Sequence, residues 1–238
     1  MGRYVTLTSN SGQGRPDEAV LRPITDDSVK EFTAEHIELG EAATLKLAVP
    51  SRSDGYLFVL AGEIELTCAD ESSVCGLHTF VGLPEGTEIS LANRFGAKAG
   101  LLYLHTQEDA RGGVLQGLGG VAITPLASAP SVYVADQKKN RTYFVSKEAA
   151  RSERAHVMVV GYEKQTITPM HHHPNAESIF IMLSGSIRFS IDGDDVVLNP
   201  GQAAFFASND RHALCCAEGV EAASFLEFHI PASFSTVK

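Results

Sequence analysis

The chain has 238 residues, of which 44% are hydrophobic and 20% are charged, a composition typical of a globular protein with a sizeable core. Acidic residues outnumber basic ones by 29 to 19, and the formal net charge of −10 argues against nucleic-acid binding, which needs a basic surface. No apolar stretch approaches the roughly 20 residues that would span a bilayer, and no apolar segment typical of a signal peptide is visible. We therefore expect a cytoplasmic protein that binds neither nucleic acid nor membrane.

The first part of the chain predicts strands and almost no helix. Residues 1–35 are a polar lead-in that we expect to pair as edge strands with the rest of the molecule. Short apolar or alternating runs follow, separated by Gly, Pro, Asn and Asp, at 56–68, 78–83, 86–93 and 100–105. Short strands at this spacing are typical of an all-β barrel or sandwich.

A second series of short strands follows a stretch without periodicity. Residues 111–135 are rich in Gly, Ala and Pro, and we interpret them as a linker. Beyond the linker, strand-like runs occur at 155–163, 178–193, 195–201, 203–208, 212–217 and 223–230. The chain is therefore predicted to hold two β domains.

The two series are copies of each other. The run around Gly62, YLFVLAGEIEL, matches the run around Gly185, IFIMLSGSIRF, at an offset of 123 residues. The closing strands LLYLH and FLEFH match at an offset of 124. Similarity over some forty residues indicates an internal duplication. We assign the first domain to residues 36–110 and the second to residues 136–238.

The second copy contains a pattern suited to a metal. In the run PMHHHPNAESI, alternate side chains of a strand share a face, so His171 and His173 point the same way. Glu177 follows after a short Pro-Asn turn, and His212 lies eleven residues beyond Gly201, where a later strand can return to the first pair. Imidazole and carboxylate donors together suit a divalent transition-metal ion.

This layout resembles the cupin superfamily. Its first motif has a His-X-His pair, a Glu three to four residues later and a Gly beyond it, and its second motif has Pro-Gly followed by a His. The segments HHHPNAESIFIMLSG and DGDDVVLNPGQAAFFASNDRHAL follow that layout. The resemblance covers both halves and implies a bicupin, an all-β fold of two tandem double-stranded β-helix (jelly-roll) barrels. It also implies that His171, His173, Glu177 and His212 bind one metal ion.

The spacing departs from the cupin pattern at the carboxylate. Seven residues separate Glu177 from Gly185, where the family has six, and a count of six leads back to Ser178. Either Glu177 is the ligand and the strand contains a one-residue bulge, or Ser178 occupies the position and the site has three histidines plus water. We favour Glu177, because an anionic oxygen balances a dication and Ser rarely does.

The first copy lacks the donors. At the offset of 123, His171 and His173 correspond to Ala48 and Pro50, and the remaining three positions correspond to Asp54, Gly55 and Ile89. One carboxylate without partners is a poor metal site. We therefore predict that the first domain is a degenerate, metal-free scaffold.

The sequence identifies neither the metal nor the catalytic residues. Mn, Fe, Co, Ni and Zn all suit the donors. Candidates for substrate contacts are Arg188, Tyr162, Phe180 and Met182, and His156 and His229 are candidates for supporting a ligand.

Two function classes remain open. The first is a metal-dependent enzyme acting on a small acidic or enolisable metabolite. Among bicupins the resemblance implies a dioxygenase, a decarboxylase, an isomerase or cyclase, or a ureidoglycine aminohydrolase-like hydrolase. The second is a non-catalytic bicupin that binds a metabolite or regulates. In both cases the partners are a small molecule and, from the habits of the family, a second copy in a homodimer.

Overall fold

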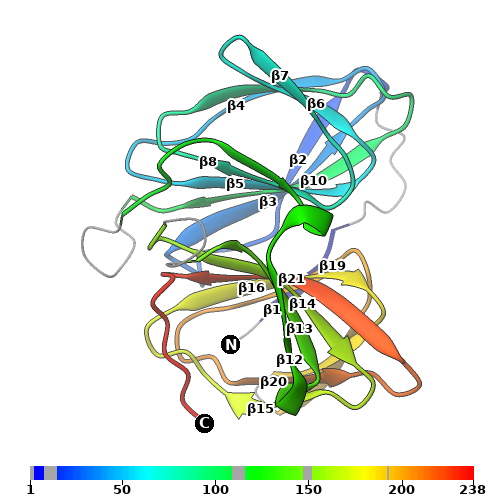
Figure 1. The fold of residues 1–238 in the computed structure, drawn as a ribbon, viewed down its shortest axis with the longest axis vertical. Helices are drawn as coiled ribbons and strands as arrows, with labels where there is room; N and C mark the ends of the chain where they lie inside the picture. The colour runs from blue at the N-terminus through cyan, green and yellow to red at the C-terminus, as the bar shows by residue number, and fades with distance from the viewer. Residues whose placement is uncertain (1–2, 8–14, 109–115, 147–151, 192) are drawn as a thin grey trace.

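In a computed structural model, the described residues 3–7, 15–108, 116–146, 152–191 and 193–238 form two stacked β-barrels (Figure 1). Parts of the predicted lead-in (1–2 and 8–14), of the linker (111–115) and of the turn at 192–194 (residue 192) lie outside these ranges. The described residues form strands, loops and two 3-10 helices, η1 (Leu126–Ser128) and η2 (Ala135–Gln137), which confirms the all-β prediction. Within this part of the chain, no helix has the length and apolar character needed to cross a membrane.

The N-terminal barrel consists of a six-stranded and a four-stranded sheet. The larger sheet has the order β11-β8-β5-β10-β3-β2, and the smaller sheet has the order β4-β9-β6-β7. The strands are β2 (Ala19–Pro23), β3 (Phe32–Leu39), β4 (Thr44–Ala48), β5 (Gly55–Ala61), β6 (Ile64–Cys68), β7 (Glu71–Cys75), β8 (Thr79–Leu83), β9 (Glu88–Ala92), β10 (Ala99–Thr106) and β11 (Ala122–Pro125).

The C-terminal barrel repeats this arrangement. Its larger sheet has the order β1-β19-β16-β21-β14-β13-β12, and its smaller sheet has the order β15-β20-β17-β18. The strands are β1 (Arg3–Thr6), β12 (Ser131–Val134), β13 (Lys139–Val145), β14 (His156–Glu163), β15 (Ile167–His171), β16 (Glu177–Ser184), β17 (Ile187–Ile191), β18 (Asp194–Leu198), β19 (Gln202–Phe206), β20 (His212–Cys216) and β21 (Ala222–Ile230).

The ladders show how closely the copies agree. Gly55 pairs with Leu83 in the first barrel, and Ser178 pairs with Phe206 in the second, at the predicted offset of 123. Edge strands come from outside each barrel, as expected for the lead-in. Strand β1, from the N-terminus, extends the C-terminal barrel beside β19, whereas β11, from the linker, extends the N-terminal barrel beside β8. The domain boundaries at residues 35, 110 and 135 stay predictions.

The apolar runs of the sequence become strands that are buried on both faces. In β16, Ile179 and Ile181 contact the core between the barrels, whereas Phe180 and Met182 face the interior of the C-terminal barrel. Such strands consist almost wholly of apolar residues because neither face meets water. The strands of the small sheets alternate instead, as in β4, because their outer face is solvated.

The core between the barrels holds them together through aromatic side chains. Phe80 of the first barrel stacks on Phe144 of the second at 4.9 Å between ring centroids, and Tyr56 meets Phe228 at 5.8 Å. Each aromatic side chain buries about 150–250 Å². The larger sheets thus pack face to face, and each barrel keeps a separate interior on its other side.

Candidate metal centre and its cavity

Three histidines converge inside the C-terminal barrel. His171 ends β15, His212 begins β20, and the two residues are direct partners across the ladder, with ring centroids 4.3 Å apart. His173 follows just beyond β15, and its ring centroid lies 5.0 Å from that of His171 and 5.5 Å from that of His212. One ring nitrogen of each lies within 4.8 Å of the other two. The structure therefore brings together the three predicted histidines.

Hydrogen bonds orient all three rings in the same way. The Nδ1 atoms of His171, His173 and His212 lie 2.8, 2.9 and 3.1 Å from the backbone oxygens of Pro169, Ser235 and Asp210, respectively. A carbonyl can only accept, so each Nδ1 carries the proton and each Nε2 keeps a free lone pair. The Nε2 atoms of His173 and His212 are buried without a hydrogen-bond partner. These orphaned acceptors fit a shared metal ion.

Burial keeps the imidazoles neutral near pH 7. It lowers the pKa of His173 to about 4, with help from the nearby His229, and it lowers the pKa of His212 to about 3, with help from His171. Burial also lowers the pKa of His171. A metal binds the neutral imidazole, so no proton has to be displaced from the three donors at neutral pH.

Glu177 does not belong to this group, which corrects the predicted ligand set. Its Oε2 accepts hydrogen bonds from the backbone N–H groups of Lys30 and Glu31, at 2.7 and 2.8 Å. In β16 it shares a face with Ile179 and Ile181, which contact the core between the barrels. Because strand side chains alternate, Glu177 points away from the barrel interior.

Ser178 occupies the interior position instead. It shares a face with Phe180 and Met182 of the barrel interior, and its ladder partners are Phe206 and His229. Its Oγ is buried and has no hydrogen-bond partner in the structure. The second spacing alternative, three histidines with Ser178 beside them, is the one that the geometry favours.

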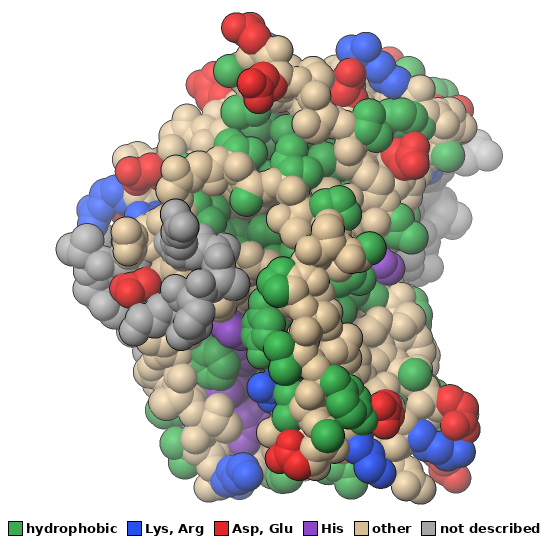
Figure 2. Space-filling model, in the orientation of Figure 1, with side chains coloured by type: hydrophobic (Ala, Val, Ile, Leu, Met, Phe, Trp, Pro, Cys, Tyr) green, Lys and Arg blue, Asp and Glu red, His purple; other side chains and the backbone are tan. Residues whose placement is uncertain are grey.

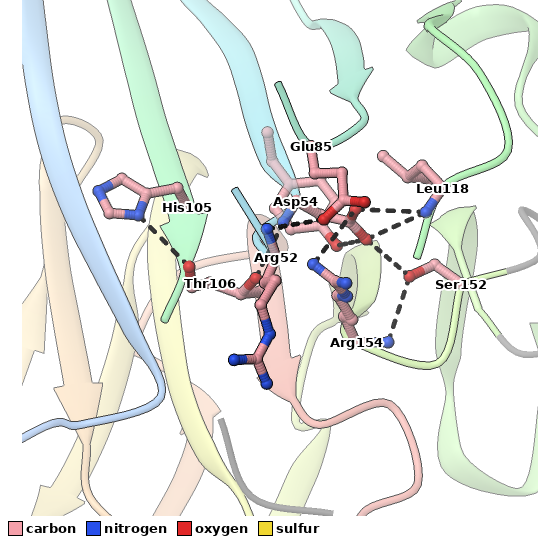
Figure 3. A network of polar contacts seen from close by, with 9 residues as sticks. Arg52, Asp54, Glu85, His105, Thr106, Leu118, Ser152 and Arg154 are labelled. Atoms are coloured by element: carbon pink, nitrogen blue, oxygen red, sulfur yellow. Dashed lines mark hydrogen bonds and ion pairs between the residues drawn. The ribbon is translucent and has the colours of Figure 1, made fainter. Parts of the chain in front are cut away.

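The carboxylate of Glu177 has a structural counterpart in Asp54, at the same position of the first copy (Figure 3). Asp54 accepts hydrogen bonds from the backbone N–H of Leu118 and the hydroxyl of Ser152, and it lies 3.8 Å from a guanidinium nitrogen of Arg154. Burial raises the pKa of Asp54, and these partners oppose the rise. Each carboxylate thus fastens its barrel to a segment from another part of the chain.

The corresponding interior of the N-terminal barrel is filled. Ile89 pairs with Leu47 in the same way as His212 pairs with His171. The structural counterparts of His171 and His173 are therefore Leu47 and Val49. They replace Ala48 and Pro50, the counterparts predicted from the sequence. A shift between Thr168 and His171 in the second ladder explains the difference of one residue. Val49 leaves no room at Gly55, where an added Cβ would lie 2.7 Å from a Val49 methyl group. All four interior positions are apolar or glycine, so none of them offers a side-chain donor to a metal.

A cavity of about 640 Å³ opens beside the histidines. Figure 2 shows histidine side chains in a hollow of the C-terminal barrel, next to basic and hydrophobic side chains. The predicted contact residues Tyr162 and Phe180 line it, whereas Met182 is buried in the barrel core. Arg188 lies on the outer face of β17, about 54% exposed and near Asp195, so its predicted place at the site is wrong. Ile187 and Phe189 take the interior positions on either side of it.

The comparisons with known proteins agree with this geometry. The cupin domain family matches residues 158–229, which include the three histidines and most strands of the C-terminal barrel. The C-terminal barrel is a cupin domain. The match lies within this barrel, and the N-terminal barrel lies outside it. No curated protein sequence matches the chain.

Solved structures share the fold over nearly the whole chain. A putative glyoxylate-induced protein from Pseudomonas aeruginosa has a TM-score of 0.73 at 17% identity, covering 95% of this chain and 88% of its own. Protein Ylba from E. coli has a TM-score of 0.74 at 12% identity, with coverage of 96% and 90%. An oxalate decarboxylase from Lactobacillus farciminis has a TM-score of 0.72 at 11% identity, with coverage of 99% and 88%. At these identities the likeness concerns the fold alone.

The cupin cavity also contains charged residues that the sequence did not single out. Glu227 lies 2.5 Å from Nε2 of His229, and the His229 ring is 4.7 Å from that of His173. Burial raises the pKa of Glu227, but His229, together with His156 and His173, lowers the pKa overall. Lys139 is buried at the start of β13. Counting alternate residues back along β21 from His229 would have placed Glu227 on the interior face.

His156 and His229, which were candidates for supporting a ligand, both line the cavity. Phe234, in the segment after β21, stacks on His229 at 3.9 Å and meets the edges of His173 and His156. The same segment supplies the Ser235 carbonyl that orients His173. The C-terminal residues therefore form one wall of the cavity, a role that their sequence did not indicate.

Proposed function

We propose that this chain is a metal-dependent bicupin enzyme that acts on a small acidic or enolisable metabolite. The observation that supports it most directly is the set of three neutral imidazoles whose Nδ1 atoms all bond backbone oxygens, so that their Nε2 atoms are free to bind one ion. Preoriented donors of this kind are typical of a metal centre. A divalent ion held there would supply Lewis acidity and open positions for a substrate.

The donor set favours an acidic substrate. Three neutral histidines and a serine leave the charge of a dication uncompensated, and Glu177 is engaged with Lys30 and Glu31 instead. An anionic oxygen of the substrate would provide that compensation in a low-dielectric cavity. Phe180, Leu214 and Phe225 supply apolar walls, and Glu227 offers a carboxylate that can accept a proton from a bound molecule.

Elemental analysis tests the metal site first. We expect about one transition-metal ion per wild-type chain and less than a tenth of that in the His171→Ala, His173→Ala double variant, because a single remaining histidine cannot hold the ion. The His78→Ala, His105→Ala double variant removes two histidines from the other half of the chain and should keep its metal. Equal metal contents in both double variants would contradict the proposal.

Activity measurements separate the function classes. Oxygen uptake and a screen of small carboxylic acids on the metal-loaded protein should reveal turnover that the His171→Ala, His173→Ala variant lacks. Redox-active Fe or Mn would direct the search to oxygen chemistry, and Zn to hydrolysis or isomerisation. The alternative, a non-catalytic binding or regulatory bicupin, is favoured by the missing carboxylate ligand, and wild-type protein without stoichiometric metal would support it. The homodimer and the cytoplasmic location stay predictions.

A further inference from the structure

Lys139 places a buried ammonium group in the wall of the cavity. Its side chain belongs to a residue that is only 7% exposed, at the first position of β13. Nζ donates a hydrogen bond of 2.5 Å to the Thr168 hydroxyl and lies 4.9 Å above the centre of the Tyr162 ring. The Tyr162 hydroxyl also contacts that of Thr168. Both contacts of the ammonium are with neutral groups, and both partners line the cavity.

The ammonium has no close counter-ion in the part of the chain that the structure describes. None of the ion pairs there, at the 4 Å limit, involves Lys139. Glu227 lines the same cavity but bonds His229 at 2.5 Å. Burial lowers the pKa of Lys139, and the more distant Glu227 only partly opposes this. A buried charge without a partner costs several kcal/mol, so such groups in a cavity are typical of sites for an oppositely charged ligand.

Two groups of residues that line the cavity, one at the histidines and one at β13, would each attract an anionic group. The histidines would hold a dication whose protein donors are all neutral. Strand β13 carries Lys139 and, two residues further on the same face, Arg141. A volume of about 640 Å³ accommodates a small metabolite that reaches both groups of residues.

We propose that Lys139, together with the hydroxyl groups of Thr168 and Tyr162, forms an anion-binding subsite in the same cavity as the three histidines, so that the cavity selects small dianions such as dicarboxylates. One anionic group binds at the histidines, and the other binds the Lys139 ammonium. The histidine part of this arrangement rests on the proposed function, whereas the Lys139 part rests on its own burial and contacts.

Calorimetric titration of the metal-loaded protein tests this subsite. The probes are malonate, succinate and glutarate, each compared with the monocarboxylate of the same chain length. The wild type should bind at least one diacid about tenfold or more tightly than its monoacid, which is the gain expected from one charge-assisted contact. Lys139→Met and Lys139→Gln should abolish this preference, and Lys139→Arg should retain part of it.

Lys164→Met is the matched control, because Lys164 is exposed and pairs only with Glu221 among the ion pairs of the described residues. It should bind the diacids as the wild type does. Preference for a diacid that persists in folded Lys139→Met and Lys139→Gln, or no preference for any of the three diacids in the wild type, would overturn the subsite.

Metal content separates the two proposals. Metal-free wild-type protein should still bind butanoate more tightly than metal-free Lys139→Met, since the ammonium remains. Absence of metal with retained dependence on Lys139 would refute only the metal-dependent function. Stoichiometric metal with diacid binding that ignores Lys139 would refute only the subsite.

Discussion

The two barrels have the same strand order but opposite interiors. In the N-terminal barrel, Val49 and Ile89 fill the space where the C-terminal barrel has His173 and His212. Gly55 occupies the position of Ser178, and the neighbouring Val49 side chain leaves no room for a Cβ atom there. Both barrels nevertheless keep a buried carboxylate on the opposite face of the same strand region, Asp54 in one and Glu177 in the other.

This difference between the two interiors separates residues that maintain the fold from residues that could form a metal site. Positions that are alike in both copies, such as the two carboxylates, bond backbone groups of neighbouring segments. Positions that differ line the barrel interiors, with apolar residues or glycine in the N-terminal barrel and polar donors in the C-terminal barrel. The fold alone therefore does not determine the site, because the same ladder supports either an apolar core or a cluster of donors.

The largest loss of stability should follow from removing either of the two buried carboxylates. Asp54→Ala and Glu177→Ala should each lower the free energy of unfolding by about 3 kcal/mol, because each leaves buried donors unsatisfied. Urea unfolding measures this loss. The folded Glu177→Ala protein should keep its metal, and loss of metal from it would restore Glu177 as a ligand. Glu221→Ala, which removes an exposed carboxylate, is the control and should cost less than about 0.5 kcal/mol.

Exchange of the equivalent interior residues sharpens the comparison. Gly55→Ser should destabilise the protein by about 2 kcal/mol, because its Cβ would overlap Val49. Ser178→Ala should leave the metal-free protein as stable as the wild type or stabler, since the Ser178 hydroxyl is buried without a partner. Thermal unfolding of both variants checks this. Equal destabilisation by the two substitutions would contradict the assigned interiors.

On acidification of the metal-free protein, the buried His171 and His173 should account for a smaller loss of stability than the removal of a buried carboxylate does. The folded pKa values of His173 and His212, about 4 and about 3, lie below the ordinary value of 6.5, so the unfolded chain takes up protons first on acidification. Stability present above pH 6.5 is therefore lost as the pH falls towards 4. Between pH 7 and pH 5, metal-free wild type should lose about 2 kcal/mol more than the His171→Ala, His173→Ala variant. Equal losses would show that these histidines are not buried and neutral.

The sequence predicted much of the architecture. Alternating and doubly apolar runs indicated the strands, and the turn glycines Gly62 and Gly185, both at positive φ, marked equivalent points of the two copies. Prediction failed where a shift of one residue along a strand changes which side chain faces the barrel interior. Glu177 and Ser178 are adjacent in a strand buried on both faces, so no pattern of polarity showed which one faces the interior. A ladder shift at Thr168 likewise displaced the predicted counterparts of the histidines in the first barrel.

The sequence by itself determined the duplication, the all-β class and the identity of three metal-ligand candidates, because these depend on spacing and strand periodicity. Only the tertiary structure decided that Glu177 joins the two halves, that Arg188 faces solvent, and that Lys139, Glu227 and the C-terminal residues share a cavity with the histidines. These residues are far apart along the chain or differ only in the face they occupy. Their contacts arise from sheet closure and barrel packing, which local sequence does not encode.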